Sequence, residues 1–231
     1  MQEFPPELIT PMISGTITVL ILVWAMFSLS SKRILYSIVI GFVLSAWFMT
    51  VLLSSQGGFF LKLSLHPLPN IGLLFVPIIV GINILTRSIN VQKIVENISQ
   101  SWLIGVQITR VMGVAFLMLY ARGLMPAEFA FPAGIGDIVI GITAPLVALV
   151  LFFKLSFGRK LAIAWNIVGF SELIVAIITG FLTSPTPYQV LALNNPNNLL
   201  FDFPMALVPV FAVPLALLLH IFSLHGLLKK S

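Results

Sequence analysis

Three charged residues, Arg110, Asp137 and Glu172, lie within stretches that are otherwise apolar enough to cross a bilayer. A charge at that depth costs roughly 3 to more than 10 kcal/mol, so such a residue faces the protein interior or a wet cavity and usually has a partner. A guanidinium can hold an anionic group, and a carboxylate can take up and release a proton. These three residues are therefore the first candidates for a functional site.

The composition indicates a polytopic membrane protein. Of the 231 residues 59% are hydrophobic and 8% are charged, whereas about a quarter of the residues of a soluble domain carry a charge. The net charge of +5 does not indicate a nucleic-acid partner, because all basic residues except Arg110 lie at or near the ends of the apolar stretches. The expected partner is the lipid bilayer. The chain has no cysteine, which excludes disulfides and thiolate sites.

The apolar stretches predict an all-α membrane protein with seven transmembrane helices in a single domain, 1–231, because each stretch has close to the roughly 20 residues that a span needs. The spans are predicted at about residues 10–30, 34–54, 71–88, 101–122, 132–153, 161–182 and 203–224. The third stretch is the shortest and contains Pro77. It is therefore either a full span or a re-entrant segment.

The basic residues predict the orientation. With the N-terminus outside, most of them fall on the cytoplasmic side, as the positive-inside rule requires. The cytoplasmic set is Lys32, Arg33, Arg87, Lys93, Lys154, Arg159, Lys160, Lys229 and Lys230, against Lys62 and Arg122 near the outer side. The segment before the first span has two glutamates and no basic residue, which is typical of an uncleaved tail. We expect an N-out, C-in protein of a bacterial inner membrane.

Residues 87–100 predict an amphipathic helix on the inner face. Val91, Ile94, Val95 and Ile98 recur at helical spacing, with polar residues opposite. Such a helix lies in the interface or extends the fourth span. It serves as a linker or as a surface for a membrane partner, and the sequence leaves both open.

A weak internal repeat suggests two parallel three-helix units joined by the fourth span. Its clearest matches are Pro11-x-x-x-Gly15-Thr16 in the first span with Pro132-x-x-x-Gly136-Asp137 in the fifth. Some transporters have this 3+1+3 layout. Apolar sequences also produce such matches by chance, so the repeat stays a hypothesis.

Depth along the helices predicts which charges meet. Arg110 lies nine residues into the fourth span from its inner end, and Glu172 eleven residues into the sixth. At 1.5 Å per residue these depths are ~14 and ~16 Å, so we predict that the two residues pair. Asp137 should lie only ~7 Å below the outer surface. It is predicted to be the more accessible acid, acting as a gate or first contact for a solute.

Uncharged polar residues extend this set towards the cytoplasm. Gln107 shares a helical face with Arg110, and Asn83, Asn166 and His220 follow on other spans. For the two asparagines, hydrogen bonding between helices is the simpler explanation, and His220 is expected at the interface. The predicted binding set is Arg110, Glu172, Asp137, Gln107, Asn166 and Asn83.

Two short resemblances involve the fifth span. Gly134-Ile135-Gly136-Asp137 resembles the GxGD motif of intramembrane aspartyl proteases. Those enzymes need two carboxylates that share a proton, but the companion aspartate and the Pro-Ala-Leu element are missing here, and Glu172 as a substitute would depart from the family. The stretch 131–137 (FPAGIGD) also resembles one in uncharacterised bacterial inner-membrane proteins. That resemblance implies no activity.

The leading hypothesis is a transporter or solute-binding protein for a small anionic or polar solute, linked to protons. The alternative is a non-catalytic subunit or sensor whose ion pair is structural, acting as an oligomer or with a membrane partner. An aspartyl protease is a remote third. No catalytic residue, metal or cofactor is predicted, since the chain has no HExxH, P-loop or GxSxG motif.

Overall fold

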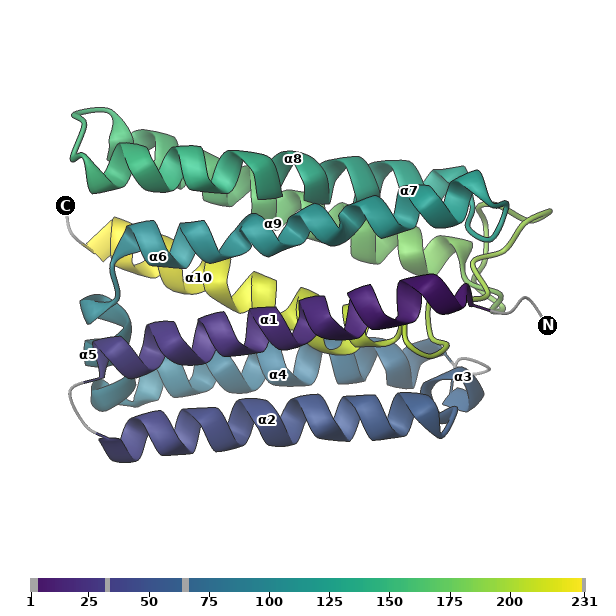
Figure 1. Ribbon diagram of the computed structural model, residues 1–231, viewed down its shortest axis with the longest axis horizontal. Coiled ribbons are helices and arrows are strands. Elements are labelled where there is room, and N and C mark those ends of the chain that lie inside the picture. Colours follow the sequence, from purple (N-terminus) through teal and green to yellow (C-terminus); the bar gives the residue numbers. More distant parts are fainter. Residues whose placement is uncertain (1–3, 32–33, 64–66, 230–231) are drawn as a thin grey trace.

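The computed structural model describes residues 4–31, 34–63 and 67–229. Every regular element in these ranges is a helix, and the long helices lie side by side (Figure 1). The prediction of an all-α membrane bundle is confirmed at this level. Lys32, Arg33 and Lys230 lie outside the described residues.

The helices follow one another up and down the bundle. The long ones are α1 (Pro6–Ser30), α2 (Ile34–Gln56), α4 (Pro67–Arg87), α8 (Ala127–Phe152), α9 (Gly158–Thr183) and α10 (Val213–Lys229). One further span consists of α6 (Gln100–Gly105), the 3₁₀ segment η1 (Val106–Gly113) and α7 (Val114–Ala121). The short elements are α3 (Phe59–Leu63), α5 (Ile89–Asn97) and the π-helical turn η2 (Val208–Ala212) before α10.

Six of the described helical stretches are long and apolar enough to cross a membrane, and a seventh counts if α4 and α5 are taken as one bent span. Each of the seven predicted spans overlaps a helical stretch, but residues 203–206 of the last one are turns. The third predicted span is the exception, because α4 reaches the length and hydropathy needed to cross a membrane only when α5 is counted with it.

The amphipathic helix predicted within 87–100 is α5. It turns by 97° from α4, and the Ser88 hydroxyl accepts a hydrogen bond from the Val91 backbone N at 3.4 Å, which caps its start. Ile94 and Val95 are buried. The sharp turn and the buried apolar face are what a helix lying across the end of the bundle requires.

Helix α8 has one exposed face and one face buried against other helices. Its exposed apolar residues recur every three or four positions: Phe131, Ile135, Val139, Ile142, Leu146 and Leu149. The buried face carries mostly small residues: Ala133, Gly134, Gly141 and Ala144. Small residues let neighbouring backbones approach closely inside a membrane. Asp137 lies among them.

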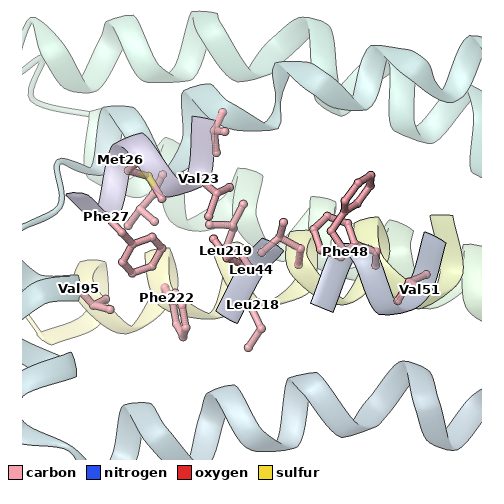
Figure 2. Packing of buried hydrophobic residues seen from close by; sticks show 14 of the residues in the cluster. Val23, Met26, Phe27, Leu44, Phe48, Val51, Val95, Leu218, Leu219 and Phe222 are labelled. Atoms are coloured by element: carbon pink, nitrogen blue, oxygen red, sulfur yellow. The ribbon is translucent and has the colours of Figure 1, made fainter. Parts of the chain in front are cut away.

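Helix α10 is the central helix. In the apolar part of the stretch formed by η2 and α10, 72% of the residues are buried, against 17% in α2. Helix α10 runs between the α8–α9 pair and the group α1, α2 and α4 (Figure 1). Leu218, Leu219 and Phe222 of α10 pack with residues of α1, α2 and α5 in the largest apolar cluster (Figure 2).

Two helices extend beyond the predicted spans in ways that affect the site. Helix α8 begins at Ala127 rather than 132, because Pro132 is accommodated within the helix and Pro126 precedes it. Helix α10 continues to Lys229 rather than ending near 224, and Arg159 Nε donates to the carbonyl of Leu227 at 3.0 Å near its end. Asp137 and His220 therefore lie further from the ends of their helices than the predicted spans indicate.

Candidate functional site

Arg110 of η1 binds both buried carboxylates. Its Nε donates to Asp137 Oδ1 at 2.6 Å, and its Nη2 donates to Glu172 Oε2. The side chains of Arg110, Asp137 and Glu172 are 6%, 18% and 12% exposed. The predicted pairing of Arg110 with Glu172 is confirmed, and Asp137 joins it. We call these three residues the ion cluster.

Asp137 lies further from the start of its helix than the five residues predicted, although it is the more accessible of the two acids, as expected. Since α8 begins at Ala127, Asp137 lies ten residues inside the helix, or ~15 Å along it. At that depth it reaches Arg110, which enters from the opposite end of the bundle. A carboxylate bound to a buried guanidinium is part of the core rather than a gate at the surface.

Close contact between η1 and α8 holds the cluster together. A Cβ added to Gly141 would lie 2.6 Å from the backbone N of Val111, and one added to Gly113 would lie 2.9 Å from the carbonyl O of Gly134. Side chains at these glycines would separate the two elements. The 3₁₀ geometry of η1 interrupts an otherwise α-helical span at Arg110, a feature that often marks a hinge or a strained functional segment.

His220 belongs to the site, contrary to the expectation that it lies at the interface. It is fully buried, and its Nε2 lies 3.3 Å from Arg110 Nη1. Arginine can only donate, so Nε2 accepts and His220 is neutral, with its proton on Nδ1. That nitrogen donates to Asn166 Oδ1 at 2.9 Å. The expectation failed because α10 extends beyond its predicted end.

The hydrogen bonds continue from His220 to the α5 end of the bundle. Asn166 Nδ2 donates to Ser223 Oγ at 3.0 Å, and Ser223 Oγ donates to Gln100 Oε1 at 2.8 Å. We call His220, Asn166, Ser223 and Gln100 the polar chain. The predicted role of Asn166 in bonding between helices is confirmed. Ser223 and Gln100 were missed; the only signal was the spacing of Ser223, three residues after His220.

The remaining predicted residues, Gln107 and Asn83, differ in their positions. Gln107 is buried beside the cluster, and its Nε2 donates to the carbonyl of Ala216 at 3.3 Å, joining η1 to α10. Asn83 lies outside the site on the exposed face of α4, where its amide donates to Ile79 O in its own helix at 2.8 Å. Its exposed apolar neighbours Ile82 and Ile84 show that this face points outward.

Two cavities meet at Asp137. The first, about 80 Å³, lies against α1, η1 and the junction of η2 with α10, and Arg110 and Thr16 line it. The second, about 60 Å³, extends along α9 towards Ser184 and Leu200. The residues common to both linings are Phe116, Asp137, Leu173, Val208 and Val213. Asp137 is therefore the carboxylate of the cluster that faces both spaces, since Glu172 lines neither.

The charges of the cluster do not balance. One guanidinium faces two carboxylates, and His220 contributes no charge in its accepting form. With both acids ionised the cluster carries one net negative charge. Glu172 Oε1 is buried and has no hydrogen-bond partner among the described residues. A proton or a cationic group would balance this charge, and the described residues hold no group of histidines and acids arranged for a metal ion.

The fold and the site define a multi-pass helical membrane protein with an ion cluster in its core. The family model called domain of unknown function (DUF8737) matches residues 65–228, which include the whole ion cluster. The chain belongs to this family. The comparisons with curated proteins and with solved structures found no match.

Proposed function

We propose that this protein is a proton-linked carrier of a small polar solute, with the ion cluster as its binding site. The observation that carries the proposal is the single guanidinium of Arg110 shared by Asp137 and Glu172 beside two cavities. Acidic groups within a membrane bundle are typical of proton and solute pathways. Glu172 is the proton-binding acid, and Asp137 contacts the solute.

The excess negative charge supports this division of roles. An unbalanced charge in a low-dielectric core is costly, so the cluster is most stable with one added positive charge. A proton on Glu172 supplies it in one state, and a solute at Asp137 supplies it in another. Because the proton and the solute would compete to balance the same negative charge, the movement of one would be coupled to the movement of the other. An anionic solute fits less well, because it would have to displace a carboxylate from Arg110.

Irregular backbone near the first cavity favours a carrier over a rigid scaffold. The 3₁₀ segment η1 contributes Arg110 and Met112 to the lining, and the π-helical turn η2 contributes Val208 and Ala212. Helices interrupted at a midplane site are a recurring feature of transporters. Movement of these two segments would open the site to one side and then the other.

The 3+1+3 layout and the orientation belong to the same proposal. Pro11 and Pro132 are each the sixth residue of their helices, α1 and α8, and Thr16 and Asp137, which follow them in the repeat, line the same cavity. The α5 end carries Arg87, Lys93, Lys154, Arg159, Lys160 and Lys229, which favours placing that end in the cytoplasm of a bacterial inner membrane.

Proteoliposomes with a trapped pH-sensitive dye test the transport proposal. Amines, amino acids, sugars and carboxylates are added in turn, and at least one should change the internal pH only when the protein is present. Glu172→Gln should abolish that change, and Glu7→Gln, which alters an exposed acid at the start of α1, should preserve it. If no solute class moves protons, or if Glu172→Gln behaves as wild type, the protein is not this carrier.

A second candidate is a non-catalytic subunit with a structural ion cluster. It is favoured by the complete pairing of Arg110, whose Nε, Nη1 and Nη2 all have partners. This candidate predicts that Arg110→Met combined with Asp137→Leu and Glu172→Leu folds and functions as wild type. Proton movement that depends on Glu172 would exclude it. A protease is the least favoured, since Arg110 binds both acids that would have to share a proton.

A further inference from the structure

We propose that the solute is a small organic cation with an apolar, ring-sized body. Its ammonium group binds Asp137, and its body occupies the cavity along α9. This inference rests on the proposed function and specifies the class of its solute.

The position of Asp137 decides where the charged group binds. Asp137 lines both cavities, and its side chain is the most exposed of the cluster at 18%. One of its oxygens accepts from Arg110 Nε. The carboxylate can therefore bind an ammonium group from the cavity side while it keeps Arg110.

The net charge decides the sign of the solute. An ammonium group beside Asp137 gives the cluster one positive charge for each negative one, whereas an anion would leave two surplus negative charges. Like charges placed together in the low-dielectric interior of a bundle are strongly disfavoured. A cation is accordingly accepted and an anion of the same shape is rejected.

The second cavity decides the nature of the body. Its lining is mostly apolar and includes Phe116, Phe129, Phe181 and Phe201. Aromatic faces attract cations as well as apolar groups. This space of about 60 Å³ is partly open and meets the first cavity, of about 80 Å³, at Asp137. Together the two spaces approach the roughly 150 Å³ of a cavity that binds a benzene ring. A cation without an apolar body would make no favourable contact with this apolar lining.

Equilibrium binding to the purified full-length protein in detergent tests the inference without requiring transport. The probe is radiolabelled 2-phenylethylammonium. Its matched competitors are 3-phenylpropionate (an anion), 2-phenylethanol (uncharged) and tetramethylammonium (a cation without the ring). We expect 2-phenylethylammonium to bind at least tenfold more tightly than any of the three.

Two variants localise the binding. Asp137→Asn leaves Arg110 paired with Glu172 and should weaken binding tenfold or more. Ala176→Leu fills the second cavity and should weaken it similarly, whereas Val175→Leu, the adjacent position on the exposed face of α9, should leave it unchanged. The second variant keeps the test informative if Asp137→Asn does not fold.

The inference is overturned if the alcohol or the carboxylate binds as tightly as the amine, if tetramethylammonium does, or if no probe binds. These failures are distinguishable from failure of the carrier proposal. Proton movement with a different class of solute would support the carrier proposal and contradict this solute class. Binding of 2-phenylethylammonium with no proton movement in proteoliposomes would leave a cation site in a protein that is not a carrier.

Discussion

Arg110 and Asp137 are joined by a 2.6 Å hydrogen bond from Nε to Oδ1, although their helices enter the bundle from opposite ends. The contact requires two things of the backbone. Helix α8 must bring Asp137 down to the middle of the bundle, and the glycines at 113 and 141 must let η1 and α8 approach. Glu172 then adds a second acid to a guanidinium that is already paired.

Removing the charge of Arg110 should destabilise the protein strongly. Arg110→Met leaves two buried carboxylates without a counter-charge, and breaking a buried pair in this way costs about 3–5 kcal/mol. Thermal unfolding in detergent measures the loss. Arg122→Met is the matched control, because Arg122 pairs with Glu7 at the surface, where such pairs contribute about 0–1 kcal/mol. Equal losses for the two variants would contradict the assignment of Arg110 to the core.

The two histidines of α10 should respond differently to the same substitution. His220→Leu removes the donor to Asn166 Oδ1 and leaves Arg110 Nη1 with only the carbonyl of Gly169, at 3.5 Å. A buried polar group left unpaired costs about 1–3 kcal/mol. His225 Nε2 is buried and has no partner among the described residues, so His225→Leu should be neutral or stabilising. The unfolding midpoints of both variants check this. A larger loss for His225→Leu would show that the polar chain does not support Arg110.

Alanine substitutions at two glycines, Gly141 and Gly105, should have different effects on stability. Gly141→Ala places a methyl group against the backbone of η1, and overpacking of this kind costs about 1–3 kcal/mol. At Gly105, in the same span as η1, an added Cβ meets only Ala148 Cβ at an ordinary 3.6 Å. Gly105→Ala should therefore be tolerated, with a gain of up to about 1 kcal/mol in helix propensity. Unfolding curves that rank the variants in the opposite order would argue against the close contact of η1 with α8.

The sequence predicted one contact of the site and missed its neighbours for identifiable reasons. Arg110 and Glu172 were counted from helix starts that the structure confirms within a few residues, at Gln100 and Gly158. The prediction that Arg110 and Glu172 lie at nearly the same level and form a pair was therefore correct. Asp137 was counted from Pro132, which resembles a helix start but lies within α8. The error of five residues hid its contact with Arg110.

The polar chain could not be predicted because it depends on which helix is central. The spans are similarly apolar in sequence, yet α10 is mostly buried and α2 mostly exposed. Only packing shows that His220 and Ser223 face inward and that Asn83 faces outward on α4. The lipid surface removes the alternation of polar and apolar faces that identifies the buried side of a helix in a soluble protein.

The most direct test of the central claim is infrared difference spectroscopy of the protein in lipid bilayers, recorded between alkaline and acidic pH. The surplus negative charge predicts that acidification protonates one buried carboxyl group, which gives a new carbonyl band. That band should vanish in Glu172→Gln and in Asp137→Asn, because either substitution balances Arg110, and it should remain in Glu7→Gln. A wild-type spectrum without the band, or a band unchanged in both cluster variants, would contradict the account.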